Sequence, residues 1–147
     1  MVISTLHTNS AVSTIDRIID VFPEAQQGQI RVQLASVLKG VVTQQLLVRQ
    51  DQPGRLAAFE ILLTTDAVAA MIRENKGHQI SSVLQTGQKA GMRQMDYDLA
   101  RLVQEGKISE KTARERCLKK PICTVFVVYC VLGFDLFFLK KDSLRCL

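Results

Sequence analysis

The first twenty residues constrain the fold more than any other stretch, because a β-rich run leads through a polar segment into an amphipathic helix. Val2 and Ile3 favour a strand, and hydroxyl-bearing residues surround His7. Ser10 is a good N-cap for a helix whose apolar residues recur at helical spacing up to Pro23. The segment therefore predicts a strand, a polar tip and a helix.

The place of His7 at this polar tip admits two interpretations. In open α/β sheets, ligands bind outside the carboxyl ends of the strands, so His7 would face the usual ligand position. A single histidine in a polar turn can equally be a solvated or hydrogen-bonded loop residue. The residues alone do not choose between the two.

The next segments predict a helix and a β-hairpin. Apolar residues on one face predict a helix over 24–38, with Gly40 as its left-handed C-terminal cap. Two strand-like runs, 41–48 and 55–63, flank the turn 51–54, in which proline and glycine supply the turn chemistry.

From residue 65 onward, apolar residues recur at helical spacing in further segments. Ser109 and Glu110 cap the last of these, since a hydroxyl and a negative charge both stabilise a helix N-terminus. Together, these elements predict an α/β fold in which strands and a β-hairpin precede a helical part.

Length and composition fit one small unit with a tail. A chain of 147 residues is long enough for a single core. The net charge of +5 is modest, the basic residues are scattered and aromatic residues are few, so we expect no nucleic-acid partner. The opening residues lack the pattern of a signal peptide, which leads us to expect a cytoplasmic protein.

Four separated segments carry a resemblance to a known family. They read TLHTNSA followed by IDRIID (5–20), GRLAAFEIL (54–62), AVAAMIRE (67–74) and QTGQKAGMRQMD (85–96). In this order they resemble motifs of the PilT-type pilus retraction ATPases, within the type II/IV secretion traffic ATPases, and the first resembles their histidine box. Two positions depart from the motifs: Ala69 stands in place of an arginine, and Phe59 in place of a histidine.

The resemblance implies the C-terminal part of a RecA-like P-loop ATPase core followed by a helical subdomain. We expect the core part over 1–64, the helical subdomain over 65–120 and a non-homologous tail over 121–147. The sequence contains no G-x-x-x-x-G-K-[ST] run and no apolar strand ending in an acidic pair before the histidine box, so both Walker motifs are missing. ATP and Mg²⁺ would belong to the parent motor, and we expect this chain alone to bind neither and to hydrolyse no ATP.

The resemblance also implies roles for individual residues. His7 would sense the γ-phosphate, with Thr5 and Thr8 fixing its orientation. The residues expected at a subunit interface or in force coupling are Arg17, Arg55, Glu60, Met71, Ile72, Arg73 and Glu74. We expect no metal site, because His78 has no second ligand at helical spacing.

The tail 121–147 resembles nothing in the family. Residues 122–139 are nearly all apolar, and lysines flank them. A span of eighteen residues containing Asp135 is at the low edge for a membrane helix. Three origins stay open: a frameshifted end, an addition that packs on the domain, and a membrane anchor.

Two classes of function follow from these expectations. In the first, the chain is part of a hexameric motor that couples ATP hydrolysis to pilus disassembly and works with a pilus-base or inner-membrane platform protein. The parent could also be a secretion or pilus assembly ATPase. In the second, the chain is a non-catalytic fragment or a module that binds the ring. Either would be cytoplasmic, with at most peripheral contact with the inner face of the membrane or a tail anchor.

Overall fold

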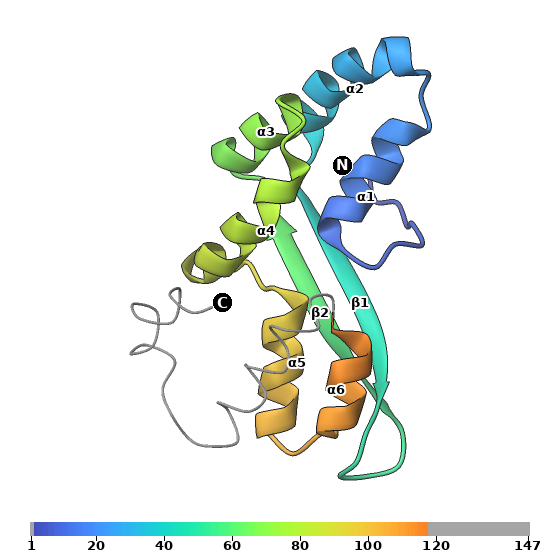
Figure 1. Cartoon of the computed structure of the whole chain (residues 1–147), viewed down its shortest axis with the longest axis vertical. Helices are drawn as coiled ribbons and strands as arrows, with labels where there is room; N and C mark the ends of the chain where they lie inside the picture. The colour runs from blue at the N-terminus through green and yellow to red at the C-terminus, as the bar shows by residue number, and fades with distance from the viewer. Residues whose placement is uncertain (1, 118–147) are drawn as a thin grey trace, which may run out of the picture.

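A long antiparallel ribbon of two strands organises the computed structural model, which describes residues 2–117 (Figure 1). Strand β1 (Gly40–Val48) pairs with β2 (Arg55–Leu63) in unbroken register from Gly40 opposite Leu63 to Val48 opposite Arg55. The turn closes where the Arg49 amide donates to the Gly54 carbonyl at 3.2 Å. Gly54 has a φ of +122°, which only glycine adopts readily. The predicted hairpin is therefore confirmed.

Helices pack along this ribbon and at its ends. Their bounds are α1 (Ala11–Asp20), α2 (Glu24–Val37), α3 (Asp66–Arg73), α4 (Gly77–Thr86), a 3₁₀ turn (Gly87–Ala90), α5 (Met95–Gln104) and α6 (Glu110–Arg116). The α/β class expected from the sequence is confirmed. The predicted cap also forms, because the Ser10 hydroxyl accepts from the Ser13 amide at 3.1 Å while the Ser13 hydroxyl accepts from the Ser10 amide at 3.2 Å.

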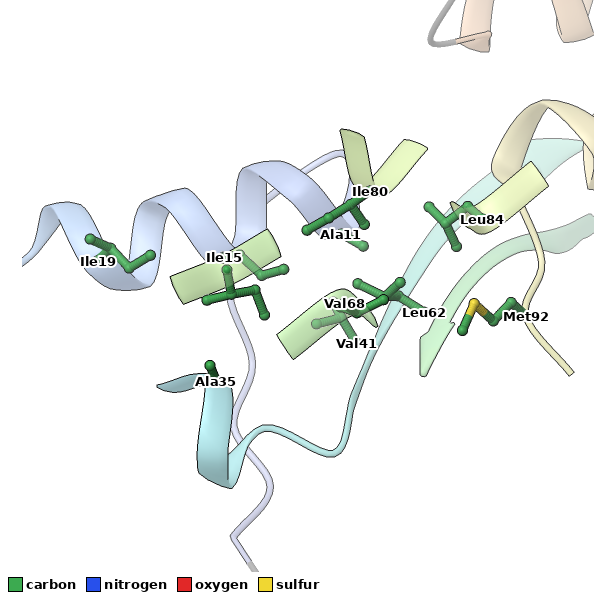
Figure 2. Packing of buried hydrophobic residues seen from close by; sticks show 11 residues of the cluster. Ala11, Ile15, Ile19, Ala35, Val41, Leu62, Val68, Ile80, Leu84 and Met92 are labelled. Carbon is green, nitrogen blue, oxygen red and sulfur yellow. The ribbon is translucent and has the colours of Figure 1, made fainter. Parts of the chain in front are cut away.

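The first of two apolar clusters joins α1 to α3, α4 and one end of the ribbon. Figure 2 shows the side chains of α1 meeting those of β1, β2 and α4. Its buried members are Ala11, Ile15, Ile19, Ala35, Val41, Leu62, Val68, Ile72, Ile80, Leu84 and Met92.

The second cluster lies where α5 and α6 pack beside the other half of the ribbon (Figure 1). Its buried members are Leu47, Ala58, Met95, Leu99, Leu102, Ile108, Ala113 and Cys117. The Gln50 amide donates to the Lys107 carbonyl at 3.0 Å, which fixes the hairpin turn to the α5–α6 connection. Each cluster contains residues from both sides of residue 64, so the domain boundary drawn there stays a prediction.

Two local predictions are wrong. Val2 and Ile3 form no strand; they are exposed, and within residues 2–117 no neighbouring strand lies there to pair with their backbone groups. Gly40 is not a helix cap, because α2 ends at Val37 with Leu38 in an extended conformation. Gly40 instead begins β1, where a Cβ would lie 2.8 Å from the Leu62 carbonyl oxygen, so the close approach of the strands requires glycine.

The predicted tail, 121–147, lies outside the described residues. Within residues 2–117, no helix is both long and apolar enough to cross a membrane.

A buried carboxylate on α5 fixes that helix to the ribbon. Asp98 is completely buried, and its Oδ2 accepts from the Phe59 amide of β2 at 2.9 Å. Its Oδ1 accepts from the guanidinium groups of Arg93 at 3.2 Å and Arg101 at 2.8 Å. Both oxygens are thus satisfied, as a buried charge requires.

We expect Asp98→Ala to lower the free energy of unfolding by about 3 to 5 kcal/mol, because it leaves a strand amide and two partly buried cations without their acceptor. Chemical denaturation of the full chain, followed by circular dichroism, measures this. Glu115→Ala, on the exposed side of α6, is the matched control and should change stability by less than about 0.5 kcal/mol. Equal stability of the two variants would contradict the anchoring role of Asp98.

Candidate functional site

His7 lies in the extended segment that leads into α1. The side chains of Thr5 and His7 are exposed, and within residues 2–117 neither makes a hydrogen bond or an ion pair. The imidazole is therefore available to a group bound against this surface.

Its neighbour Thr8 is held by a chain of hydroxyls. The Thr14 hydroxyl donates to the Ser10 carbonyl at 2.8 Å, and the Thr8 and Thr14 hydroxyl oxygens lie 2.7 Å apart. Since a hydroxyl has one proton, Thr8 must be the donor to Thr14. The residue after His7 is thus tied to the first turns of α1, which limits where the imidazole can lie.

An open hollow brings together three of the residues predicted from the sequence: His7, Thr8 and Arg17. Arg17 reaches it from the exposed side of α1. The full lining consists of His7, Thr8, Asn9, Ser13, Asp16, Arg17, Asp20 and Val21.

Two carboxylates in this hollow, those of Asp16 and Asp20, repel further negative charge. Desolvation first, and then the nearby Asp20 carboxylate, raise the pKa of Asp16, while Arg31 acts in the opposite direction. A phosphate in the hollow would meet Arg17 and His7 but also these two acids.

The N-terminus of α1 offers no replacement for a P-loop. A free helix N-terminus binds phosphate through its unpaired amides. Here, however, the Ala11 amide donates to Glu60 Oε1 at 2.8 Å, and the Ser13 amide donates to the Ser10 hydroxyl. Two of the first three amides of α1 are therefore already bonded and are not free to bind a phosphate.

Glu60, expected at a subunit boundary, lies inside the molecule. Its side chain is 2% exposed and accepts from two helix N-termini: the Ala11 amide of α1 through Oε1, and the Met95 amide of α5 through Oε2 at 3.3 Å. The sequence carried a signal for this position, since period two places Glu60 on the same inward side of β2 as the buried Ala58 and Leu62.

Burial dominates the electrostatics of Glu60. Desolvation raises its pKa above the ordinary value of 4.5, the two backbone hydrogen bonds lower it in part, and the nearby Asp96 raises it further.

The other predicted residues lie away from the hollow. Arg55 is exposed at the turn end of the ribbon, where it stands opposite Val48. Ile72 is buried in the first cluster and Met71 packs against it, while Arg73 is exposed. Glu74 pairs with Lys76 at 2.6 Å on the surface. Their expected roles in coupling or in a subunit interface stay predictions.

Sequence reasoning missed several residues that shape this region. Asp98 holds α5 against β2, and Thr14 holds Thr8 by a hydrogen bond. Asp20 adds a negative charge to the hollow. A helical wheel of α1 would have placed Asp16, Arg17 and Asp20 together on its polar side. Asp98 gave no such signal, because its partner amide is distant in sequence.

Known proteins resemble this chain over most of its described length. The profile of the type II/IV secretion system protein family matches residues 1–116. A twitching motility protein from Neisseria gonorrhoeae is 48% identical over 116 residues, which cover 79% of this chain and 31% of that protein. The type IV pilus retraction ATPase PilT from Pseudomonas aeruginosa is 43% identical over 116 residues, covering 79% and 33%.

A solved structure extends the comparison to the fold. The structure of the pilus retraction motor PilT with bound ADP superposes with a TM-score of 0.71 at 36% identity, and covers 80% of this chain and 32% of that chain. This chain thus spans about a third of the length of the relatives it matches.

We expect the ionisation of Glu60 to make the folded chain less stable as pH rises. Because its pKa is higher in the folded than in the unfolded state, the folded state binds the proton more tightly, and stability is lost as pH rises from 4.5 through the folded pKa. The unfolding free energy of the parent minus that of Glu60→Gln should therefore fall as pH rises above 4.5.

Glu105→Gln is the control with the opposite sign. Hydrogen bonds from Lys107 and Arg101 lower the pKa of Glu105, so the difference between the parent and this variant should grow as pH rises. Urea denaturation at several pH values measures both. If the difference in unfolding free energy between the parent and Glu60→Gln does not change with pH, the raised pKa of Glu60 is contradicted.

Proposed function

Because this chain belongs to the type II/IV secretion system protein family, we propose that it supplies the C-terminal part of a motor ATPase of the pilus retraction type. In this role it contributes the histidine-bearing surface of a hexameric motor that couples ATP hydrolysis to pilus disassembly. The phosphate cradle and the Mg²⁺ site come from residues outside the matched segment.

One observation carries this proposal: His7 is exposed beside a hollow, and two of the neighbouring helix amides, those of Ala11 and Ser13, are already bonded. The sequence supports it, because no P-loop run is present, and so does the match to about a third of the PilT chain. The identities of 48% and 43% to proteins named for twitching motility and pilus retraction favour retraction over secretion or assembly.

The proposed chemistry for His7 is hydrogen bonding at a terminal phosphate. An imidazole N–H aimed at charge that develops during phosphoryl transfer stabilises the transition state. The Thr8–Thr14 hydrogen bond restrains the backbone next to His7, and Arg17 adds a positive charge to the same hollow. Arg17 and the segment 71–74 would meet neighbouring parts of the ring, as would Arg55 at the hairpin turn.

The wider assignments rest on the same proposal. The motor would be a homo-hexamer in the cytoplasm, acting on a pilus-base or inner-membrane platform protein. A non-catalytic role as a module that binds the ring is the second candidate, and the bonded amides of α1 favour it for the chain acting alone.

We expect the purified chain of 147 residues neither to bind ATP with micromolar affinity nor to hydrolyse it. One histidine and one arginine beside two carboxylates do not replace the amides, lysine and Mg²⁺ of a P-loop. Isothermal titration calorimetry with Mg-ATP tests the binding, and PilT from Pseudomonas aeruginosa is the positive control. Micromolar affinity of this chain for ATP would overturn the proposal that the phosphate cradle comes from residues outside the matched segment.

A chimera tests His7 directly. Residues 2–116 replace the matching segment of Pseudomonas aeruginosa PilT, which supplies the rest of the chain. We expect His7→Ala to lower the ATPase kcat of an active chimera by about a hundredfold to a thousandfold, with a much smaller change in KM, because one preorganised donor is lost.

His78→Ala, in the exposed first turn of α4, is the matched histidine control and should leave kcat unchanged. Equal activity of the His7 variant and the parent chimera would make His7 a loop residue and leave the chain as scaffold.

A further inference from the structure

Glu60 is a charged side chain in a position that packing alone would fill with an apolar one. It lies on the inward side of β2 between Ala58 and Leu62, which are both completely buried. Burying a charge is costly, and well-packed apolar residues can often replace buried ionic groups without loss of stability. What the carboxylate adds at this position is therefore its hydrogen bonds and not the filling of space.

Those hydrogen bonds fix the place where α1 begins. Glu60 Oε1 accepts from the Ala11 amide at 2.8 Å, and Oε2 accepts from the Met95 amide at 3.3 Å. Ala11 is completely buried in the first cluster (Figure 2), and Met95 is completely buried in the second. Because close-packed neighbours surround both residues, neither helix start can easily shift away from the carboxylate. The first residue of α1 is thus held at a set place relative to β2 and α5.

A second set of hydrogen bonds extends from α1 back toward His7. The Ser10 carbonyl accepts from the Thr14 amide at 3.0 Å and from the Thr14 hydroxyl at 2.8 Å. The Thr8 hydroxyl donates to the Thr14 hydroxyl at 2.7 Å. Thr8 and Ser10 are therefore both bonded to one residue of α1, and His7 comes directly before Thr8.

We propose that Glu60 is a positioning residue for His7. By holding the Ala11 amide it sets the first turn of α1, and through Thr14 that turn sets residues 8–10, the backbone next to the imidazole. A donor fixed in this way can contribute to phosphoryl transfer because it needs no reorientation when charge develops. The inference rests on the proposed function, and it gives Glu60 a role inside one subunit.

Backbone order in the full chain tests the positioning directly. In the parent, we expect NMR relaxation of the amides to give residues 8–10 order parameters of about 0.85, as for rigid backbone. Glu60→Leu removes both acceptors and should lower these order parameters to below about 0.6. Asp98→Ala is the matched control, because it removes another buried carboxylate that bonds β2 to α5, and it should leave residues 8–10 ordered.

A second variant covers the case in which Glu60→Leu does not fold by circular dichroism. Thr14→Val removes the hydroxyl through which α1 holds Thr8, keeps the branched shape of threonine, and should lower the order parameter of Thr8. Order parameters below about 0.6 for residues 8–10 of the parent would overturn the proposal. So would unchanged values in the folded variant.

A double-mutant cycle in the chimera with Pseudomonas aeruginosa PilT shows whether Glu60 acts through His7. We expect Glu60→Leu to lower kcat at least about tenfold, with a much smaller change in KM. In the His7→Ala background, the same substitution should lower kcat by less than about twofold, because the group that it positions is already gone. Equal effects in both backgrounds would overturn the proposal, since Glu60 would then act independently of His7.

The two experiments separate this inference from the proposed function. If His7→Ala lowers kcat while Glu60→Leu does not, the proposed function stands and the positioning role of Glu60 is overturned. If His7→Ala leaves kcat unchanged, the proposed function fails, and the order parameters of the full chain alone decide whether Glu60 fixes the backbone next to His7.

Discussion

One buried carboxylate holds the two halves of this molecule in place. Glu60 lies in β2 and accepts from the first amide of α1 and the first amide of α5. α1 packs in the first apolar cluster and α5 in the second, so the same side chain fixes the start of one helix in each. Because His7 lies four residues before Ala11, the place of the imidazole depends on this contact as well.

The charge on Glu60 is well suited to this double role, although burial disfavours it. A carboxylate offers two oxygens that point to two donors at once, and the positive ends of two helix dipoles stabilise a negative charge between them. Desolvation and Asp96 oppose that charge and raise the pKa of Glu60. A glutamine would keep one acceptor and place a donor against the other helix amide. Replacing Glu60 with its isostere therefore does not preserve both hydrogen bonds to the helix N-termini.

Local signals in the sequence predicted most of the elements, while long-range pairing decided the rest. The hairpin was predictable because the turn 51–54 and the period of two agree, and Ser10 marked the start of α1 through its own side chain. Val2 and Ile3 have strand propensity, yet a strand forms only where a neighbour accepts its hydrogen bonds. Glu60 and Asp98 bond to amides 35 to 49 residues away, which no local pattern reveals.

The hydrogen bond from the Ala11 amide to Glu60, which helps to position His7, also leaves α1 with fewer free amides for a phosphate. Helix N-termini that bind phosphate need free amides, and here Glu60 and Ser10 occupy two of those at the start of α1. These two amides are used internally, so they help to fix the position of the helix and are not free to bind a phosphate. A surface of this kind suits a residue that contacts a phosphate bound elsewhere, since orientation comes from the scaffold and binding from the partner residues. The capping of α1 therefore supports the proposal that His7 and the residues that bind the phosphates lie in different parts of the motor.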